Sequence, residues 1–272
     1  MKTLSNSINI ELAKIHEWLK INKLSLNIDK TKLMIIHSSR RKMDLYDHLQ
    51  LQINGQPIKR VKSFNFLGIV INEHLTWTDH IAHISQKINP VVPLISRLKH
   101  QLPTHILKMI YNSLILSRLH YGNILWGKSP GSLIKLQKKA LRVVIGARYN
   151  AHTNPIEKKL KLLSLPDIHQ TKLICLYKKL VDKKVPNHTE DMFKNIDLLQ
   201  DLTLPRTKTY ENTIRFELPI YLKTAPNYFI EQAQLLKYPC FKYKIKSHIL
   251  ERYSSLCTVL GCRNCQYSMV SN

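Results

Sequence analysis

The hydrophobic pattern of the first 22 residues is that of a helix. From Ile8 onward, apolar side chains recur at steps of three and four, which predicts a helix that ends near Asn22 and packs Trp18 in the core. Residues 24–28 then alternate apolar and polar side chains, as a half-buried strand does. Residues 33–36 are more continuously apolar and predict a second strand.

Further strand patterns surround a turn signal. Residues 49–53 alternate again and run into Asn54-Gly55, a dipeptide that tolerates the positive φ angles of a tight hairpin turn. Residues 57–61 are the expected return strand. Residues 66–71 predict one more strand, which would place Gly68 inside it.

Beyond Trp77 the hydrophobic period becomes that of a helix. Residues 81–98 form one helical seam, in which we expect a break or kink at Pro90 and Pro93. The remaining helices are predicted over residues 104–126, 132–147, 154–163 and 166–183, with shorter pieces after Val185. The pattern therefore predicts an α+β fold, in which a small antiparallel or mixed sheet is followed by a mainly helical region. We expect domains over residues 1–74, 75–184 and 185–272.

The composition points to a polyanionic partner. The chain has 272 residues and a formal net charge of +24, from 42 Lys and Arg against 18 Asp and Glu. Such an excess attracts nucleic acids, and an anionic membrane surface is the alternative. No apolar run approaches the roughly 20 residues that span a bilayer, so we expect no membrane partner. The five cysteines are an odd number and argue against a secreted disulfide framework. We expect an intracellular protein, in the nucleus or the cytoplasm.

Positive charge is concentrated on the helix predicted over residues 132–147. Its basic side chains lie on one face, opposite an apolar face, at Lys135, Lys138, Lys139 and Arg142. Residues 128–184 hold 14 Lys and Arg against Glu157, Asp167 and Asp182. An ordinary solvated face would carry interleaved acidic partners. Because these are missing here, the pattern favours a surface that binds the phosphate backbone.

Several segments together carry a family resemblance. Residues 18–32 read Trp-Leu-Lys-Ile-Asn-Lys-Leu-Ser-Leu-Asn-Ile-Asp-Lys-Thr-Lys, and residues 64–69 read Phe-Asn-Phe-Leu-Gly-Ile. Residues 75–81, 111–127 and 136–142 continue the match. Over about residues 8–183, the chain resembles the end of the palm and the thumb or connection region of reverse transcriptases of non-long-terminal-repeat retrotransposons, of the jockey-like or CR1-like type.

The resemblance implies an RNA-directed DNA polymerase that uses Mg²⁺ to extend a primer on a template, so that the partners are RNA and DNA held by the backbone of their duplex. It implies that Lys30 lies near the incoming triphosphate. It also implies that a hairpin around Phe66, Leu67 and Gly68 holds the 3′ end of the primer. The alternatives are that Lys30 is a solvated strand end and that Gly68 marks a bulge with a packing role.

The catalytic carboxylates of such a polymerase are missing. Two-metal nucleotidyl transfer needs clustered carboxylates, and the chain contains no pair of adjacent aspartates. We expect that these acids belong to a missing N-terminal polymerase half, that this chain binds no cofactor, and that it grips nucleic acid without polymerising. Two alternatives stay open: a non-enzymatic nucleic-acid-binding protein derived from a retroelement, and a helical scaffold for protein partners.

The end of the chain holds a weak candidate zinc site. Cys257, Cys262 and Cys265 include a Cys-x-x-Cys pair, whose thiolates bind zinc in many small sites. A fourth ligand would have to be His248 or lie beyond the last residue. Because three ligands with this spacing do not make up a typical zinc site, we favour the interpretation that these cysteines are free thiols.

Overall fold

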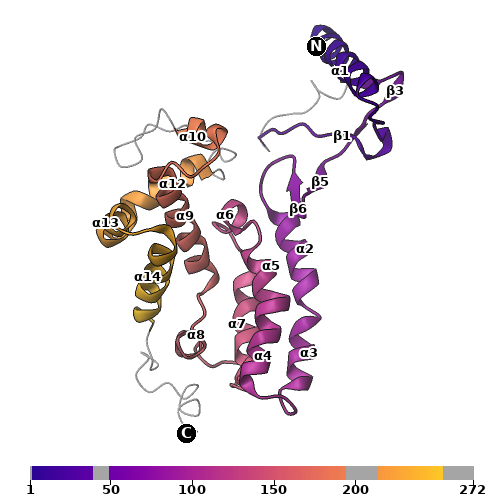
Figure 1. Cartoon of the computed structure of the whole chain (residues 1–272). Coiled ribbons are helices and arrows are strands. Elements are labelled where there is room, and N and C mark those ends of the chain that lie inside the picture. The colour runs from indigo at the N-terminus through magenta and orange to yellow at the C-terminus, as the bar shows by residue number, and fades with distance from the viewer. Residues whose placement is uncertain (1, 39–48, 194–213, 254–272) are drawn as a thin grey trace. The chain divides into compact units, whose positions relative to one another are not determined.

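The computed structural model describes residues 2–38, 49–193 and 214–253. These residues confirm the predicted α+β class: one helix and three short two-stranded sheets come first and a mainly helical region follows (Figure 1). The chain divides into two compact units, Met1–Asp79 and His80–Asn272, and each is described by itself. The three domains that we expect from the sequence stay predictions.

The first unit opens with helix α1 (Lys2–Ile21), which contacts strand β2 (Gln52–Ile53). The hydroxyl of Ser5 donates to the carbonyl of Gln50 at 2.8 Å, and the Asn9 side chain accepts from the N–H of Gln52 at 3.0 Å. The prediction that Trp18 is buried was wrong, because this side chain is 59% exposed. Trp18 lies more than two turns beyond the residues of α1 that hydrogen-bond to the strand.

The strand predicted over residues 24–28 is not formed. Its last residue instead begins a 3₁₀ turn, Ile28–Lys30, which Asn27 caps by accepting the N–H of Lys30 at 3.0 Å. An asparagine side chain that bonds the nearby backbone competes with strand pairing in this way. Strand β1 is also shorter than predicted, since it covers only Lys32–Leu33, and it pairs in parallel with β4 (Lys59–Arg60).

The hairpin predicted at Asn54-Gly55 is confirmed. β2 pairs antiparallel with β3 (Gln56–Pro57), and the two turn residues have φ angles of 49° and 75°. Positive φ at both central residues is the requirement of a two-residue type I′ turn. The predicted return strand over residues 57–61 is divided, because β3 ends at Pro57 and β4 then pairs elsewhere.

A second hairpin replaces the continuous strand predicted over residues 66–71. Strands β5 (Ser63–Phe66) and β6 (Ile69–Asn72) pair antiparallel. Leu67 and Gly68 join them with φ angles of 49° and 81°. The prediction that Gly68 lies inside a strand was therefore wrong: it occupies the turn, where its freedom at positive φ lets the chain reverse.

Two helices lie on either side of the predicted break, at the start of the helical region. α2 (Thr78–Ile88) and α3 (Val91–Leu98) are separated at Pro90. Pro93 does not interrupt α3, because it lies in the first turn, where the backbone N–H groups have no helical partner to lose.

The helix predicted over residues 104–126 is divided. It runs through α4 (Thr104–Tyr111), a π-helical turn (Asn112–Leu116) and α5 (Ser117–His120). Gly122, at a φ of 58°, then ends this run before α6 (Asn123–Trp126) begins.

The other predicted helices are confirmed, with ends that differ by a few residues. They are α7 (Ser132–Val144), α8 (Asn154–Leu160) and α9 (Leu165–Val181). The shorter pieces expected after Val185 include α10 (Asn187–Phe193), α12 (Ile214–Thr224), α13 (Asn227–Leu235) and α14 (Tyr238–Glu251).

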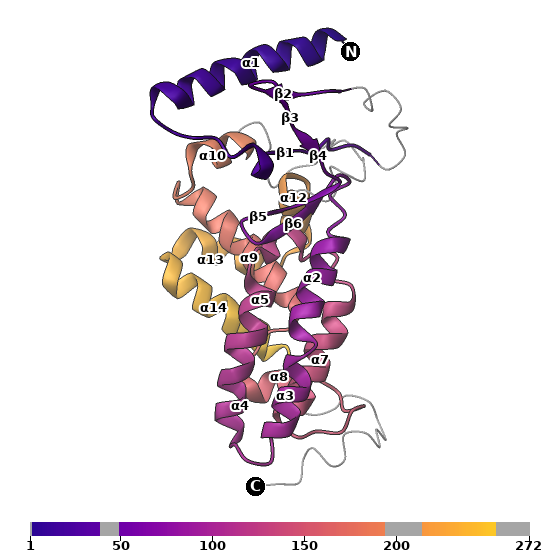
Figure 2. The same ribbon diagram turned by 90° about the vertical axis from the view of Figure 1, so that its right-hand side faces the viewer.

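Two packing centres stabilise the second unit (Figures 1 and 2). In one, α3 and α4 contact each other and both contact α7. In the other, α12, α13 and α14 all contact α9. Helix α7 also contacts α8 and α9, so the two centres are continuous.

Gln137 of α7 is a buried polar link between these centres. It is 1% exposed, its Nε2 donates to the carbonyl of Leu163 at 3.1 Å, and its Oε1 accepts from the N–H of Leu165 at 2.8 Å. Nε2 also lies 3.4 Å from the hydroxyl of Tyr111 on α4. Because buried backbone groups need partners, this side chain satisfies the backbone on either side of Ser164, the N-cap residue of α9.

We expect Gln137→Leu to lower the free energy of unfolding by about 2–4 kcal/mol, because two buried backbone groups lose their partner. Urea denaturation followed by circular dichroism measures the change. The control is Gln101→Leu, at an exposed position between α3 and α4. Equal unfolding midpoints for the two variants would contradict this account of Gln137.

Candidate nucleic-acid interface

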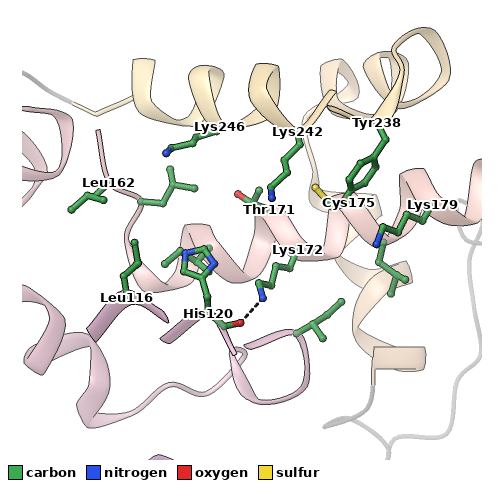
Figure 3. A pocket seen from close by; sticks show the side chains of 14 residues that line it. Leu116, His120, Leu162, Thr171, Lys172, Cys175, Lys179, Tyr238, Lys242 and Lys246 are labelled. Atoms are coloured by element: carbon green, nitrogen blue, oxygen red, sulfur yellow. Dashed lines mark hydrogen bonds between the residues drawn. The ribbon is translucent and has the colours of Figure 1, made fainter. Parts of the chain in front are cut away.

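A basic cavity of about 520 Å³ lies between α9, α14 and the segment from the π-helical turn to α6 (Figure 3). Apolar side chains such as Leu116, Ile124 and Ile168 form part of its wall. Its charged lining residues are Lys172 and Lys179 of α9 and Lys242 and Lys246 of α14. The cavity therefore combines an apolar wall with a group of cations.

Helical spacing brings these lysines to the cavity. Lys172 and Lys179 are seven residues apart and share one face of α9, as Lys242 and Lys246 do at a spacing of four on α14. Lys242 and Lys246 each directly follow a fully buried residue, Phe241 and Ile245. Burial of Phe241 and Ile245 therefore determines which side of α14 Lys242 and Lys246 occupy.

The lining residues, all in the described part of the chain, include no carboxylate. Burial and the nearby charge of Lys242 lower the pKa of Lys172, and burial, Lys108 and Lys242 lower the pKa of Lys246. The Nζ of Lys172 also donates to the backbone carbonyl of His120 (Figure 3). Cations that destabilise one another in this way favour the binding of an anion between them.

His120 is a neutral member of the cavity lining at physiological pH. The pKa of His120 is lowered to about 4. Partial burial is the largest cause, and the nearby charges of Lys172, Lys242 and Lys246 add to it. A neutral imidazole can donate or accept a hydrogen bond. It adds no charge to the group of lysines.

The cationic face of α7 is divided in two by the structure. Lys135 and Lys139 are exposed and line a second cavity of about 250 Å³ together with Ser85 of α2 and Asn89, which directly follows this helix. This pair is available to a ligand. Its role in binding phosphate stays a prediction.

Lys138 and Arg142, the other two residues of that face, are half-buried beside Glu157 of α8. Glu157 is 1% exposed, and burial raises its pKa to about 7 against the opposing effect of the two cations. Arg142 also donates from Nε to the carbonyl of Ala151 at 2.7 Å. The acidic partner that the sequence of α7 lacks is therefore supplied by another helix.

The residues assigned by resemblance to nucleotide and primer lie in the first unit. Lys30 is exposed at the end of the 3₁₀ turn. Phe66 and Leu67 are 56% and 75% exposed at the tip of the β5–β6 hairpin, next to Gly68. A hairpin is thus present where one was expected, and the roles of these residues stay predictions.

The weak zinc candidates Cys257, Cys262 and Cys265 lie outside the described residues. His248 is described, and its ring stacks on Tyr228 with the centroids 4.6 Å apart.

The Mg²⁺ ions of a two-metal polymerase site do not fit the residues that the structure describes. Such a site requires clustered carboxylates. Within residues 2–38, 49–193 and 214–253, the one group of three potential metal ligands is His37, Glu73 and His74, which has a single carboxylate. The same ranges contain no helix that is both long and apolar enough to cross a lipid bilayer.

Two curated proteins of Drosophila melanogaster are similar to this chain. A segment of 124 residues is 31% identical to the RNA-directed DNA polymerase from mobile element jockey. A segment of 163 residues is 23% identical to the probable RNA-directed DNA polymerase from transposon X-element. The chain is a homologue of part of these polymerases. The resemblance to jockey-like reverse transcriptases is thereby confirmed.

The homology covers 43% of this chain for the jockey polymerase and 57% for the X-element polymerase. The matched segments make up only 14% and 17% of those two proteins. No protein-family model and no solved structure matches the chain.

The sequence did not single out the cavity lysines as a group. Lys242 and Lys246 stand in a lysine-rich run, and Lys172 and Lys179 have helical spacing, but each pair alone is typical of a solvated face. The two pairs are separated by more than 60 residues. Only the packing of α14 on α9 brings them to one cavity.

We expect Arg142→Gln to lower the free energy of unfolding by about 1–3 kcal/mol, since the carbonyl of the buried Ala151 loses its partner. Lys139→Gln, on the same helix and exposed, should change it by less than about 0.5 kcal/mol. Denaturant titration of the two variants measures both values. Equal free energies of unfolding for the two variants would contradict a structural role for the Arg142 hydrogen bond.

The lowered pKa of His120 makes stability depend on pH. The folded chain keeps this imidazole neutral down to about pH 4, whereas an unfolded histidine takes up a proton near its ordinary value of 6.5. The unfolded state therefore binds more protons between these values, and stability contributed by His120 is lost as pH falls through this window.

We expect His120→Gln to reduce the loss of stability between pH 6.5 and pH 4, as measured by urea midpoints across this range. His105→Gln removes an exposed imidazole outside the cavity and is the control. If the urea midpoints of His120→Gln and of the unsubstituted chain fall equally with pH, the lowered pKa of His120 is contradicted.

Proposed function

We propose that the chain is part of an RNA-directed DNA polymerase of a jockey-like mobile element, and that its helical unit binds the sugar-phosphate backbone of an RNA–DNA primer-template. The observation that carries the proposal is the carboxylate-free cavity bounded by Lys172, Lys242 and Lys246. Its support from comparison is the homology to two mobile-element polymerases.

Backbone contacts explain this cavity better than base recognition. Lysine ammonium groups bind phosphate oxygens as point charges and carry no sequence information by themselves. The net charge of +24 adds a long-range attraction that speeds the encounter with any nucleic acid. The proposed binding is therefore tolerant of sequence and sensitive to salt.

The proposal assigns binding, and not nucleotide transfer, to this chain. The sequence has no adjacent aspartates, and the described residues offer no cluster of carboxylates for two Mg²⁺ ions. In the parent enzyme, Mg²⁺ would be held by acids outside this chain and would stabilise the charge of the reacting phosphates. Residues of the present chain would hold the duplex on which that chemistry acts.

The decisive test compares two double variants of α14. Lys242→Gln with Lys246→Gln removes two charges from the cavity. Lys237→Gln with Lys244→Gln removes two exposed charges that do not line the cavity, one at the N-cap of α14 and one within the helix. We expect the first variant to bind an RNA–DNA duplex more weakly at every sequence. Its plot of log K against log salt should be shallower by about 1–2, because each lost phosphate contact removes about one released counterion.

The second variant isolates the effect of net charge, and it should keep the salt dependence of the unsubstituted chain. Equal weakening in both variants would show that overall charge and not the cavity binds the duplex. Binding that is insensitive to salt would support the protein-scaffold alternative, since apolar docking releases no counterions. Nucleotide incorporation by the purified chain would contradict the assignment of binding alone.

A further inference from the structure

Three potential metal ligands converge in the first unit, far in sequence from the cavity lysines. His37 lies five residues past the start of β1, and Glu73 and His74 directly follow β6. The Nε2 of His37 is 3.7 Å from Oε2 of Glu73, and the Nε2 of His74 is 3.8 Å from Oε1. One ligand atom from each of the three residues lies within 4.8 Å of the other two.

The backbone holds these residues together before any ligand binds. The N–H of His37 donates to the carbonyl of Glu73 at 2.9 Å, and the N–H of Glu73 donates to the carbonyl of Lys62 at 2.9 Å. The segment after β1 is thus fixed against the end of β6. The three side chains need no large chain movement to meet.

Both imidazoles are oriented by their second nitrogen. The Nδ1 of His37 lies 3.0 Å from the carbonyl of Ser38, and the Nδ1 of His74 lies 3.2 Å from the carbonyl of His37. A carbonyl oxygen only accepts, so Nδ1 carries the proton in both rings. In the neutral rings Nε2 then presents a lone pair. Histidines that bind metals are oriented by the same kind of contact.

The two Nε2 atoms therefore face a carboxylate, which is also an acceptor. The side chain of His37 is 7% exposed, and its Nε2 has no hydrogen-bond partner among the described residues. Separations of 3.7 and 3.8 Å are longer than hydrogen bonds of about 2.7–3.2 Å. Lone pairs that face one another at this distance are stabilised by a cation placed between them.

We propose that His37, Glu73 and His74 form a zinc site. Two imidazole nitrogens and one carboxylate oxygen are a ligand set that Zn²⁺ takes, whereas Mg²⁺ prefers oxygen ligands. Bonds of about 2.0–2.2 Å in a tetrahedral arrangement place ligand atoms about 3.4 Å apart. The three ligand atoms lie within 4.8 Å of one another, so each pair needs to approach by no more than about 1.4 Å, and water completes the fourth position.

The site has a structural role in the first unit. Among the described residues of Met1–Asp79, the apolar side chains that are buried are Leu51, Ile53 and Ile69. Small units with little apolar core often depend on a bound metal for stability. Zinc at this position would bridge two segments that are 36 residues apart in the sequence.

The test uses the full chain without an affinity tag, in which Cys257, Cys262 and Cys265 are replaced by Ser so that terminal thiolates cannot bind zinc. After loading with Zn²⁺ alone and dialysis, we expect one zinc per chain by mass spectrometry of the metal. Glu73→Gln and His74→Ala should each weaken zinc affinity at least tenfold. His105→Ala, an exposed histidine of the second unit, is the control and should retain the metal.

A second measurement does not depend on the folding of a variant. In the chain that carries only the three Cys→Ser substitutions, addition of Zn²⁺ should shift the NMR signals of Nε2 of His37 and His74. The signal of His105 should not change. A chain that retains no zinc would overturn the proposal. Retention that is unaffected by Glu73→Gln and His74→Ala, or shifts confined to other histidines, would overturn it as well.

Discussion

The apolar packing of α14 on α9 is the interaction on which the basic cavity depends. Phe241, Ile245 and Ile249 of α14 are each 0% exposed, and full burial of such a side chain stabilises a fold by about 1.5–3 kcal/mol. This gain offsets the repulsion between the lysines that α9 and α14 bring to the cavity. Burial, followed by this repulsion, lowers the pKa values of Lys172 and Lys246. A phosphate in the cavity would relieve the same repulsion, so affinity for an anion follows from how the two helices are held together.

Helix α9 is also held by a buried polar chain and not by apolar contacts alone. His169 lies with Nδ1 3.0 Å from the carbonyl of Asn123 and with Nε2 2.9 Å from Oε1 of Glu217, so it joins α6 and α12 to α9. Gly127 permits this approach, because a Cβ at that position would lie 2.5 Å from Nδ1 of His169. The orientation of α9 is thereby determined by polar contacts as well as by apolar packing. Its lysines are held toward the cavity by the rest of the unit.

Local signals in the sequence predicted local structure well. Asn54-Gly55 specified its hairpin, and Pro90 marked the break between α2 and α3, because turn and helix chemistry act over a few residues. The prediction of a strand over residues 24–28 was wrong because Asn27 caps a 3₁₀ turn. An alternating hydrophobic pattern does not show that a side chain will compete with strand pairing for the backbone. The candidate sites could not be predicted in the same way. Glu157 reaches the cationic face of α7 from another helix, and the lysine cavity requires contact between segments far apart in the sequence.

The two units differ in what stabilises them, and this difference bears on their chemistry. The second unit has a continuous helical core, so it can hold like charges close together at the cost of some stability. The first unit has strands of two to four residues and few buried apolar side chains among its described residues. Hairpins of this length are marginal in water without a covering element. A cation shared by His37, Glu73 and His74 would supply through coordination the cohesion that the second unit obtains from apolar burial.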